Sequence, residues 1–144
     1  MFDIKIIPYK SPEYFLQVHF RYRLLRKPLG LTFSRNELLN ESNDIFIAGY
    51  IDSMMMSCCI LSPLSISEIK LRQMAIDTSF QQNGYGKKII QFAENYIQIQ
   101  SHYRYITLNA RADATSFYEK CGYTKHEPSF IEVSIVHYKM SKNI

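Results

Sequence analysis

Residues 71–98 read LRQMAIDTSFQQNGYGKKIIQFAENYIQ: an apolar strand, a turn with two glycines, and an amphipathic helix. Apolar residues recur at helical spacing after the turn, namely Ile89, Ile90, Ala93, Tyr96 and Ile97. The first N–H groups of a helix lack intrahelical partners, and the helix dipole adds partial positive charge there. Gly84 and Gly86 let the backbone approach an anion closely, and Lys87 or Lys88 adds charge. The pattern predicts a phosphate site at the helix start, with an ordinary glycine turn as the alternative.

Two well-known phosphate-binding loops do not fit these glycines. The dinucleotide-binding fingerprint needs a further glycine at the position of Ile89. A Walker A loop needs Ser or Thr directly after its lysine, and here Lys87 is followed by Lys88. Both nucleotide-binding motifs are therefore excluded.

The composition indicates an ordinary globular protein. A chain of 144 residues has the length of one domain, so we predict a single domain over residues 1–144. The content of 47% hydrophobic and 21% charged residues shows no bias toward disorder. Apolar runs are too short to span a bilayer, and residues 1–10 lack the apolar centre of a signal peptide. We therefore predict a cytoplasmic protein with no membrane contact.

The three cysteines and four histidines form no metal or disulfide pattern. Cys58 and Cys59 are neighbours in an apolar run and Cys121 is remote, so all three are predicted to be buried thiols. The histidines show no metal-ligand spacing, so no metal site is predicted.

The first half of the chain predicts a strand at residues 2–7 and a helix that begins at Ser11-Pro12-Glu13. The expected buried stripe of this helix comprises Phe15, Val18, Tyr22 and Leu25. The basic residues that follow are Arg21, Arg23, Arg26 and Lys27. Basic residues between aromatics suit nucleic acid, but a solvated helix face is the favoured interpretation, so no nucleic-acid partner is predicted.

The rest of the chain predicts a short helix at residues 36–39 and then mainly strands. A hairpin joins residues 45–51 and 54–61 around Asp52-Ser53. A strand at 68–77 leads into the opening stretch, and a strand at 105–110 and a helix at 113–121 follow, the helix ending at Gly122. Strands at 123–126 and 131–140 are expected to pair around a turn at 127–129. This order predicts a mixed α/β sheet.

Two motifs resemble a known family. Gln81-x-x-Gly84-x-Gly86 resembles the acyl-CoA pyrophosphate loop of the GNAT superfamily of N-acetyltransferases, Arg/Gln-x-x-Gly-x-Gly/Ala. YITLNARADATSFYEKCGY (residues 105–123) resembles the next strand and helix of that superfamily, ending in its Phe-Tyr-x-x-x-Gly-Phe/Tyr signature. Three further stretches are similar to segments of a branch of small bacterial members with poorly defined substrates. They are RKPLGL (residues 26–31), LRQMAID (residues 71–77) and IVHYKMSK (residues 135–142).

The resemblance implies an α/β (α+β) fold with a mixed, largely antiparallel sheet of six to seven strands. About four helices would flank the sheet, which would be splayed between its two central parallel strands. The implied cosubstrate is acetyl-CoA, with no metal. The implied cofactor contacts are Met74, Ala75, Ile76, Gln81, Gln82, Asn83, Gly84, Tyr85, Gly86, Lys87, Asn109, Ala114, Phe117 and Tyr118. Residues 74–76 would pair with the pantetheine amides, and the N–H groups of residues 82–87 would hold the diphosphate.

The implied activity is acetyl transfer to a primary amine of a small molecule or peptide, by direct attack in a ternary complex. Tyr118 would act as general acid toward the leaving thiolate. A covalent route through Cys121 finds no activating partner in the sequence. The alternative is a non-catalytic acyl-CoA-binding or regulatory module.

Several features of the implied enzyme stay open in the sequence. The general base is one of Glu37, Glu41, Glu68, His137 or water. The acceptor is expected to be selected by residues 32–44 and by the final hairpin. A homodimer and acyl groups other than acetyl also remain open.

Overall fold

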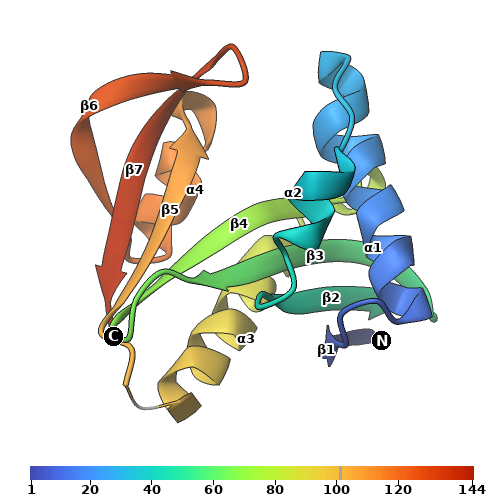
Figure 1. Cartoon of the computed structure of the whole chain (residues 1–144). Helices are drawn as coiled ribbons and strands as arrows, with labels where there is room; N and C mark the ends of the chain where they lie inside the picture. Colours follow the sequence, from blue (N-terminus) through green and yellow to red (C-terminus); the bar gives the residue numbers. More distant parts are fainter. Residues whose placement is uncertain (101) are drawn as a thin grey trace.

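Seven strands form one mixed sheet in the order β1-β2-β3-β4-β5-β7-β6 in the computed structural model, which describes residues 1–100 and 102–144 (Figure 1). The strands are β1 (Phe2–Ile7), β2 (Ile45–Ile51), β3 (Met54–Pro63), β4 (Glu68–Ile76), β5 (Tyr105–Arg111), β6 (Thr124–Glu132) and β7 (Ile135–Asn143). The α-helices are α1 (Pro12–Arg21), α2 (Arg35–Leu39), α3 (Tyr85–Gln100) and α4 (Thr115–Lys120). A π-helical turn, Tyr22–Arg26, continues α1, and short 3₁₀ turns lie at Lys27–Leu29, Thr78–Phe80 and Ala112–Ala114. The expected fold class is confirmed.

Alternating side chains divide the core between the two faces of the sheet. On one face, Ile69 and Leu71 of β4 pack with Ile89 and Ala93 of α3. On the other face, helix α1 covers β2 and β3, and its Tyr14 packs with neighbouring strand residues. Helices α1 and α2 therefore lie on the face opposite to α3 and α4.

Strands β4 and β5 are the parallel pair, and they separate soon after they meet. Within the described residues they pair only at Glu68↔Tyr105, Ile69↔Ile106 and Lys70↔Thr107. Figure 1 shows the two strands together near the C-terminus and diverging from there. The expected splay is confirmed, and it leaves β4 beyond Lys70 without a strand partner on its β5 side.

A β-bulge in β4 lies beside this opening. Cys58 pairs with Ala75 and Ile60 with Arg72, so β4 holds one residue more than β3 between these pairs. The extra residue is Gln73, which has a left-handed backbone with φ of 50°. The bulge places Gln73 on the α1 face directly after Arg72, and Met74 returns to the α3 face.

The predicted buried stripe of α1 is partly wrong, although Val18 and Leu25 are partly buried against the core as expected. Phe15 is 57% exposed, whereas the buried residues of the helix are Tyr14, Gln17, Phe20 and Arg21. Two polar residues can occupy this buried face because partners satisfy them: Gln17 Nε2 donates to the carbonyl of Ile47, and Arg21 pairs with Glu41. Arg21 is therefore not part of a solvated basic face.

The predicted turn at residues 127–129 is also wrong. Strand β6 continues through this segment, and the reversal occurs at Val133 and Ser134, which both have positive φ. Pro128 is tolerated because β6 is an edge strand, where a missing N–H costs no ladder hydrogen bond. The register shift between His126 and Phe130 absorbs the irregularity.

Two other local predictions, the β2–β3 turn and the short helix at residues 36–39, are confirmed. Asp52 and Ser53 form the β2–β3 turn, both with positive φ. Helix α2 begins with a capping box in which Ser34 and Glu37 exchange hydrogen bonds. No helix in residues 1–100 and 102–144 has both the length and the apolar character needed to cross a bilayer.

Candidate active site

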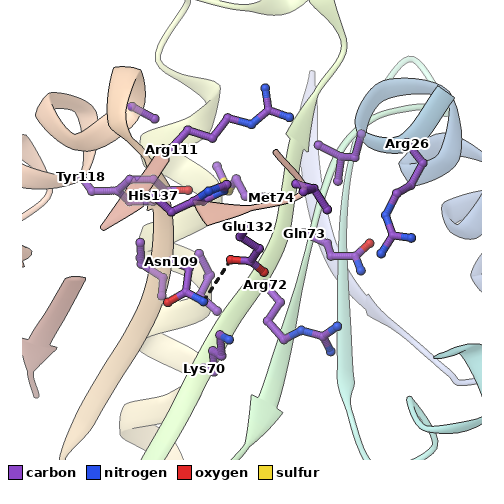
Figure 2. Close-up of a pocket in the computed structure, with 16 residues that line it drawn as sticks. Arg26, Lys70, Arg72, Gln73, Met74, Asn109, Arg111, Tyr118, Glu132 and His137 are labelled. Carbon is purple, nitrogen blue, oxygen red and sulfur yellow. Dashed lines mark hydrogen bonds between the residues drawn. The ribbon is translucent and has the colours of Figure 1, made fainter. Parts of the chain in front are cut away.

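A cavity of about 290 Å³ occupies the opening between β4 and β5. Its walls come from both strands, the start of α4, the turn after α1 and the β6–β7 hairpin. Four predicted site residues line it, namely Met74, Asn109, Ala114 and Tyr118 (Figure 2). The splay and the bulge together create this space.

The start of α3 carries the two glycines of the predicted phosphate loop. Gly84 has a φ of +81°, and a side chain there would extend into open space. Gly86 is buried, and a Cβ there would lie 3.0 Å from the ring of Phe117 and 3.2 Å from Ile76. Gly86 therefore lets α3 pack closely against α4 and the end of β4.

Side-chain amides hold the loop before α3 in place. Gln81 Nε2 donates to the carbonyl of Ile76 at 3.0 Å, and Asn83 Nδ2 donates to the carbonyls of Phe80 and Gln81. The first turn of α3 forms when Lys88 N–H donates to the carbonyl of Gly84. The N–H groups just before Lys88 therefore have no intrahelical acceptor.

Phe117 and Ile76 both lie against the position of Gly86. Tyr118 and Met74, one and two residues from them in the chain, line the cavity. The side chain of Ala75 is buried on the α1 face of β4, so only its backbone can face the opening. The predicted cofactor residues thus form two adjacent groups, one at the α3 start and one along the cavity.

Tyr118 lies at the cavity with its side chain mostly buried. Its ring meets Phe117 edge-on at a centroid distance of 5.0 Å and Tyr123 at 6.0 Å. Burial, and then proximity to Cys59 and Cys121, raises the pKa of the Tyr118 phenol above its ordinary value. The phenol therefore holds its proton at neutral pH, as a general acid must.

Among the four side chains considered as general base, only His137 lines the cavity. Its Nδ1 lies 2.8 Å from the carbonyl of Ile135. A carbonyl only accepts, so Nδ1 carries the proton and Nε2 of the neutral ring keeps its lone pair. Glu37 pairs with Arg26, and Glu41 is buried against Arg21.

Several charged side chains of the cavity were missed from the sequence. They are Arg26, Lys70, Arg72, Arg111 and Glu132. Alternation along β4 is the signal that could have found Lys70 and Arg72, because Ile69 and Leu71 occupy the opposite face.

Asn109 Nδ2 donates to Glu132 at 3.3 Å, as Figure 2 shows. The predicted contact between Asn109 and the cofactor stays a prediction.

A buried polar network contacts the bulge from the α1 face of the sheet. Arg21 donates to both carboxylate oxygens of Glu41, at 2.7 and 3.0 Å, and Tyr14 donates to Glu41 at 2.9 Å. Arg21 also donates to the side-chain oxygen of Gln73 at 3.1 Å. Residues 32–44 therefore reach the site through ion pairs, namely Glu37 with Arg26, Asp44 with Arg72, and Glu41 with Arg21. None of residues 32–44 lines the described cavity.

The cysteines are expected to be poor nucleophiles. Burial raises the pKa of the Cys58 thiol to about 12, raises that of Cys59 well above its ordinary value, and also raises that of half-buried Cys121. Since the reactive thiolate forms only as pH approaches the pKa, a thiol-titrating disulfide reagent at about pH 8 should leave Cys58 and Cys59 unmodified. Slow reaction of Cys121 alone is expected, and all three should react in urea. Fast native modification of Cys58 would contradict its burial.

The described residues contain no group of three or more His, Cys, Asp or Glu side chains placed to hold a metal ion.

Residues 34–144 match the family described as acetyltransferase (GNAT) domain. The chain belongs to the GNAT acetyltransferase family. As a GNAT protein it is by class an acyl-CoA-dependent N-acyltransferase.

Solved GNAT structures resemble the whole chain at low identity. An acyl-CoA N-acyltransferase from Pseudomonas aeruginosa aligns with a TM-score of 0.82 at 12% identity, covering 99% of each chain. ElaA from Escherichia coli has the same TM-score and coverage at 11% identity. A GNAT acetyltransferase from Elizabethkingia anophelis, solved with acetyl-CoA bound, aligns with a TM-score of 0.73 at 15% identity, covering 99% of this chain and 98% of that one. At these identities the likeness establishes the fold.

Proposed function

We propose that residues 1–144 act as one acetyl-CoA-dependent N-acetyltransferase domain that transfers an acetyl group to a primary amine by direct attack in a ternary complex. The observation that carries this proposal is the cavity through the β4–β5 opening, with Tyr118 and His137 both in its wall. The acetyl-CoA-bound relative from E. anophelis supports the choice of cosubstrate.

The residues at the α3 start suit an acyl-CoA diphosphate. Gly84 leaves open space above its backbone, and the N–H groups of the first helical turn face no intrahelical acceptor. Lys87 and Lys88 are exposed beside this turn and add positive charge. Backbone groups of Met74, Ala75 and Ile76, free of a β5 partner, suit the amides of the pantetheine arm.

Two proton transfers would be carried out by residues of the chain. Acetyl-CoA supplies an acetyl thioester, and the C–N bond to the amine forms as the C–S bond breaks. His137 Nε2 accepts the proton that leaves the amine, and the Tyr118 hydroxyl gives its proton to the leaving sulfur.

Gly84→Val is expected to abolish thermal stabilisation of the protein by CoA. The branched side chain would occupy the open space where the diphosphate is proposed to lie, and it would strain a backbone with φ of +81°. Differential scanning fluorimetry with and without CoA measures the shift in melting temperature.

Gly30→Val is the matched control for this test. Gly30 also has a left-handed backbone, with φ of +69°, and open space around its Cβ position, but it lies after α1. Both variants should lose similar stability, and only Gly84→Val should lose the response to CoA. An unchanged CoA response in Gly84→Val would remove this loop from the proposal.

An amine panel separates the enzyme from the non-catalytic alternative. Release of free CoA thiol from acetyl-CoA in the presence of an amine is the expected result. Thermal stabilisation by CoA together with no turnover of any amine would favour the acyl-CoA-binding module instead.

A further inference from the structure

We propose that the cavity selects a small primary amine that also carries one anionic group, held by Lys70 and Arg72 at the end where β4 and β5 join. The anionic group is a carboxylate or a phosphate. This inference rests on the proposed acetyl transfer, and it identifies the chemical class of the acceptor.

The first observation is the excess of positive charge in the cavity wall. Four arginine or lysine side chains line it, and Glu132 is the one carboxylate among the described lining residues. Two of these cations are already compensated, since Arg26 pairs with Glu37 and Arg72 pairs with Asp44. The two others, Lys70 and Arg111, have no carboxylate within 4.0 Å in residues 1–100 and 102–144. A cavity of this charge disfavours polycations and attracts anions.

The second observation is the position of Lys70 relative to the strand junction. Lys70 is the last β4 residue paired with β5, so it stands where the opening closes. Arg72 follows on the same face of β4, and its guanidinium also contacts Ser62 at 3.1 Å. Glu68, the other charged residue of this face, accepts from Thr107 and lies outside the cavity wall. Lys70 thus presents at the closed end an ammonium that is unpaired among the described residues, and Arg72 adds a guanidinium whose Nη1 already donates to Asp44 and Ser62.

The third observation is the order of charges along the cavity. Figure 2 shows Lys70 at one end, Arg111 at the opposite end, and Glu132 between them beside Asn109. An amine arrives as an ammonium in neutral water, and Glu132 offers it a carboxylate near His137. An acceptor with its anionic group on Lys70 would therefore direct its nitrogen toward Glu132 and His137.

The size of the cavity limits the acceptor. A volume of about 290 Å³ lies at the lower end of the range for ligand sites, and the acetyl group must share it. A short amine with a single anionic group satisfies both the volume and the charge order.

The test compares amines that share an aminoalkyl chain and differ in whether they carry an anionic group, at constant ionic strength and saturating acetyl-CoA. Phosphoethanolamine is paired with ethanolamine, and β-alanine with 3-aminopropanol; 1,3-diaminopropane is the cationic member. We expect kcat/KM to be about ten-fold higher or more for each anionic member, as a charge-assisted contact gives. The phosphate and carboxylate arms identify which anion is preferred.

Variants locate the anion site. Lys70→Met should lower the anionic-to-neutral ratio of kcat/KM about ten-fold, and Lys70→Glu should favour the diamine. Lys120→Met, on the exposed end of α4 and outside the cavity wall, should leave the ratio unchanged, and Arg111→Gln, at the other end of the cavity, should lower it less than Lys70→Met does. A wild-type ratio near one, or an equal loss for both amines in Lys70→Met, would overturn the inference.

Calorimetry separates this inference from the proposed function. If no amine is acetylated, the transferase proposal fails, and direct binding of phosphoethanolamine and ethanolamine decides the anion site. Selective binding of phosphoethanolamine that disappears in Lys70→Met would support the site. Absence of that binding would overturn it.

Discussion

Replacement of Arg21 with methionine is expected to lower the free energy of unfolding by about 3–5 kcal/mol. The Arg21 side chain is fully buried, and it donates two hydrogen bonds to Glu41. Methionine would leave the Glu41 carboxylate buried without its charge partner, which costs more than the lost bonds alone. Urea unfolding followed by circular dichroism measures the change.

Arg23→Met is the matched control on the adjoining turn. Arg23 pairs with Asp77 at 3.1 Å, but its side chain is 46% exposed. Exposed ion pairs contribute about 0–1 kcal/mol, so this variant should lose little stability. Similar losses for Arg21→Met and Arg23→Met would show that burial does not govern the Arg21 pair.

A double variant tests the cause of the Arg21 effect. Arg21→Met combined with Glu41→Met removes both charges, so no unpaired ion remains in the core. Its loss of stability should therefore be smaller than the sum of the two single losses. An additive result would assign the cost to packing instead of charge.

The sequence was sufficient for the α3 start because it follows from local rules, and the splay was implied by the resemblance to the GNAT superfamily. Glycines before a 3.6-residue apolar period mark the helix start, and the motifs around Gly84 and Tyr118 occur in the order of one known fold. The structure places Gly86 against Phe117 and Ile76, which joins the two motifs in space.

The buried face of α1 was missed because its polar residues are satisfied by distant partners. Gln17 and Arg21 bond to Ile47 and Glu41, which lie 30 and 20 residues away. Hydropathy assigns such residues to solvent, and only the folded chain shows their acceptors.

The bulge and the β6–β7 turn were missed because they rely on non-glycine residues with positive φ. Gln73, Val133 and Ser134 adopt this conformation, although none is a residue type that predicts it. The bulge changes the alternation of β4, and the turn places Glu132 and His137 at the cavity. The charged residues of the cavity wall could therefore be identified only once the register of the strands was known.

Tyr118→Phe is expected to lower kcat by about 100-fold, because the variant lacks the hydroxyl that we propose as proton donor to the leaving thiolate. Its ring contacts with Phe117 and Tyr123 remain, so the melting temperature should change little. Thiol release at saturating acetyl-CoA and amine measures kcat. Wild-type rates in Tyr118→Phe at every pH would remove Tyr118 from the mechanism.

The pH profile and a second tyrosine make this test specific. The neutral phenol is the proposed active form, and burial raises the pKa of Tyr118, so activity should be lost only as pH rises above the ordinary tyrosine pKa of about 10. Tyr123→Phe is the control, because the Tyr123 hydroxyl donates to Glu94 at 3.0 Å and does not line the described cavity. It should lose about 1 kcal/mol of stability and retain wild-type kcat. Opposite responses of these neighbouring tyrosines would separate a proton donor at the cavity from a phenol that only stabilises the fold.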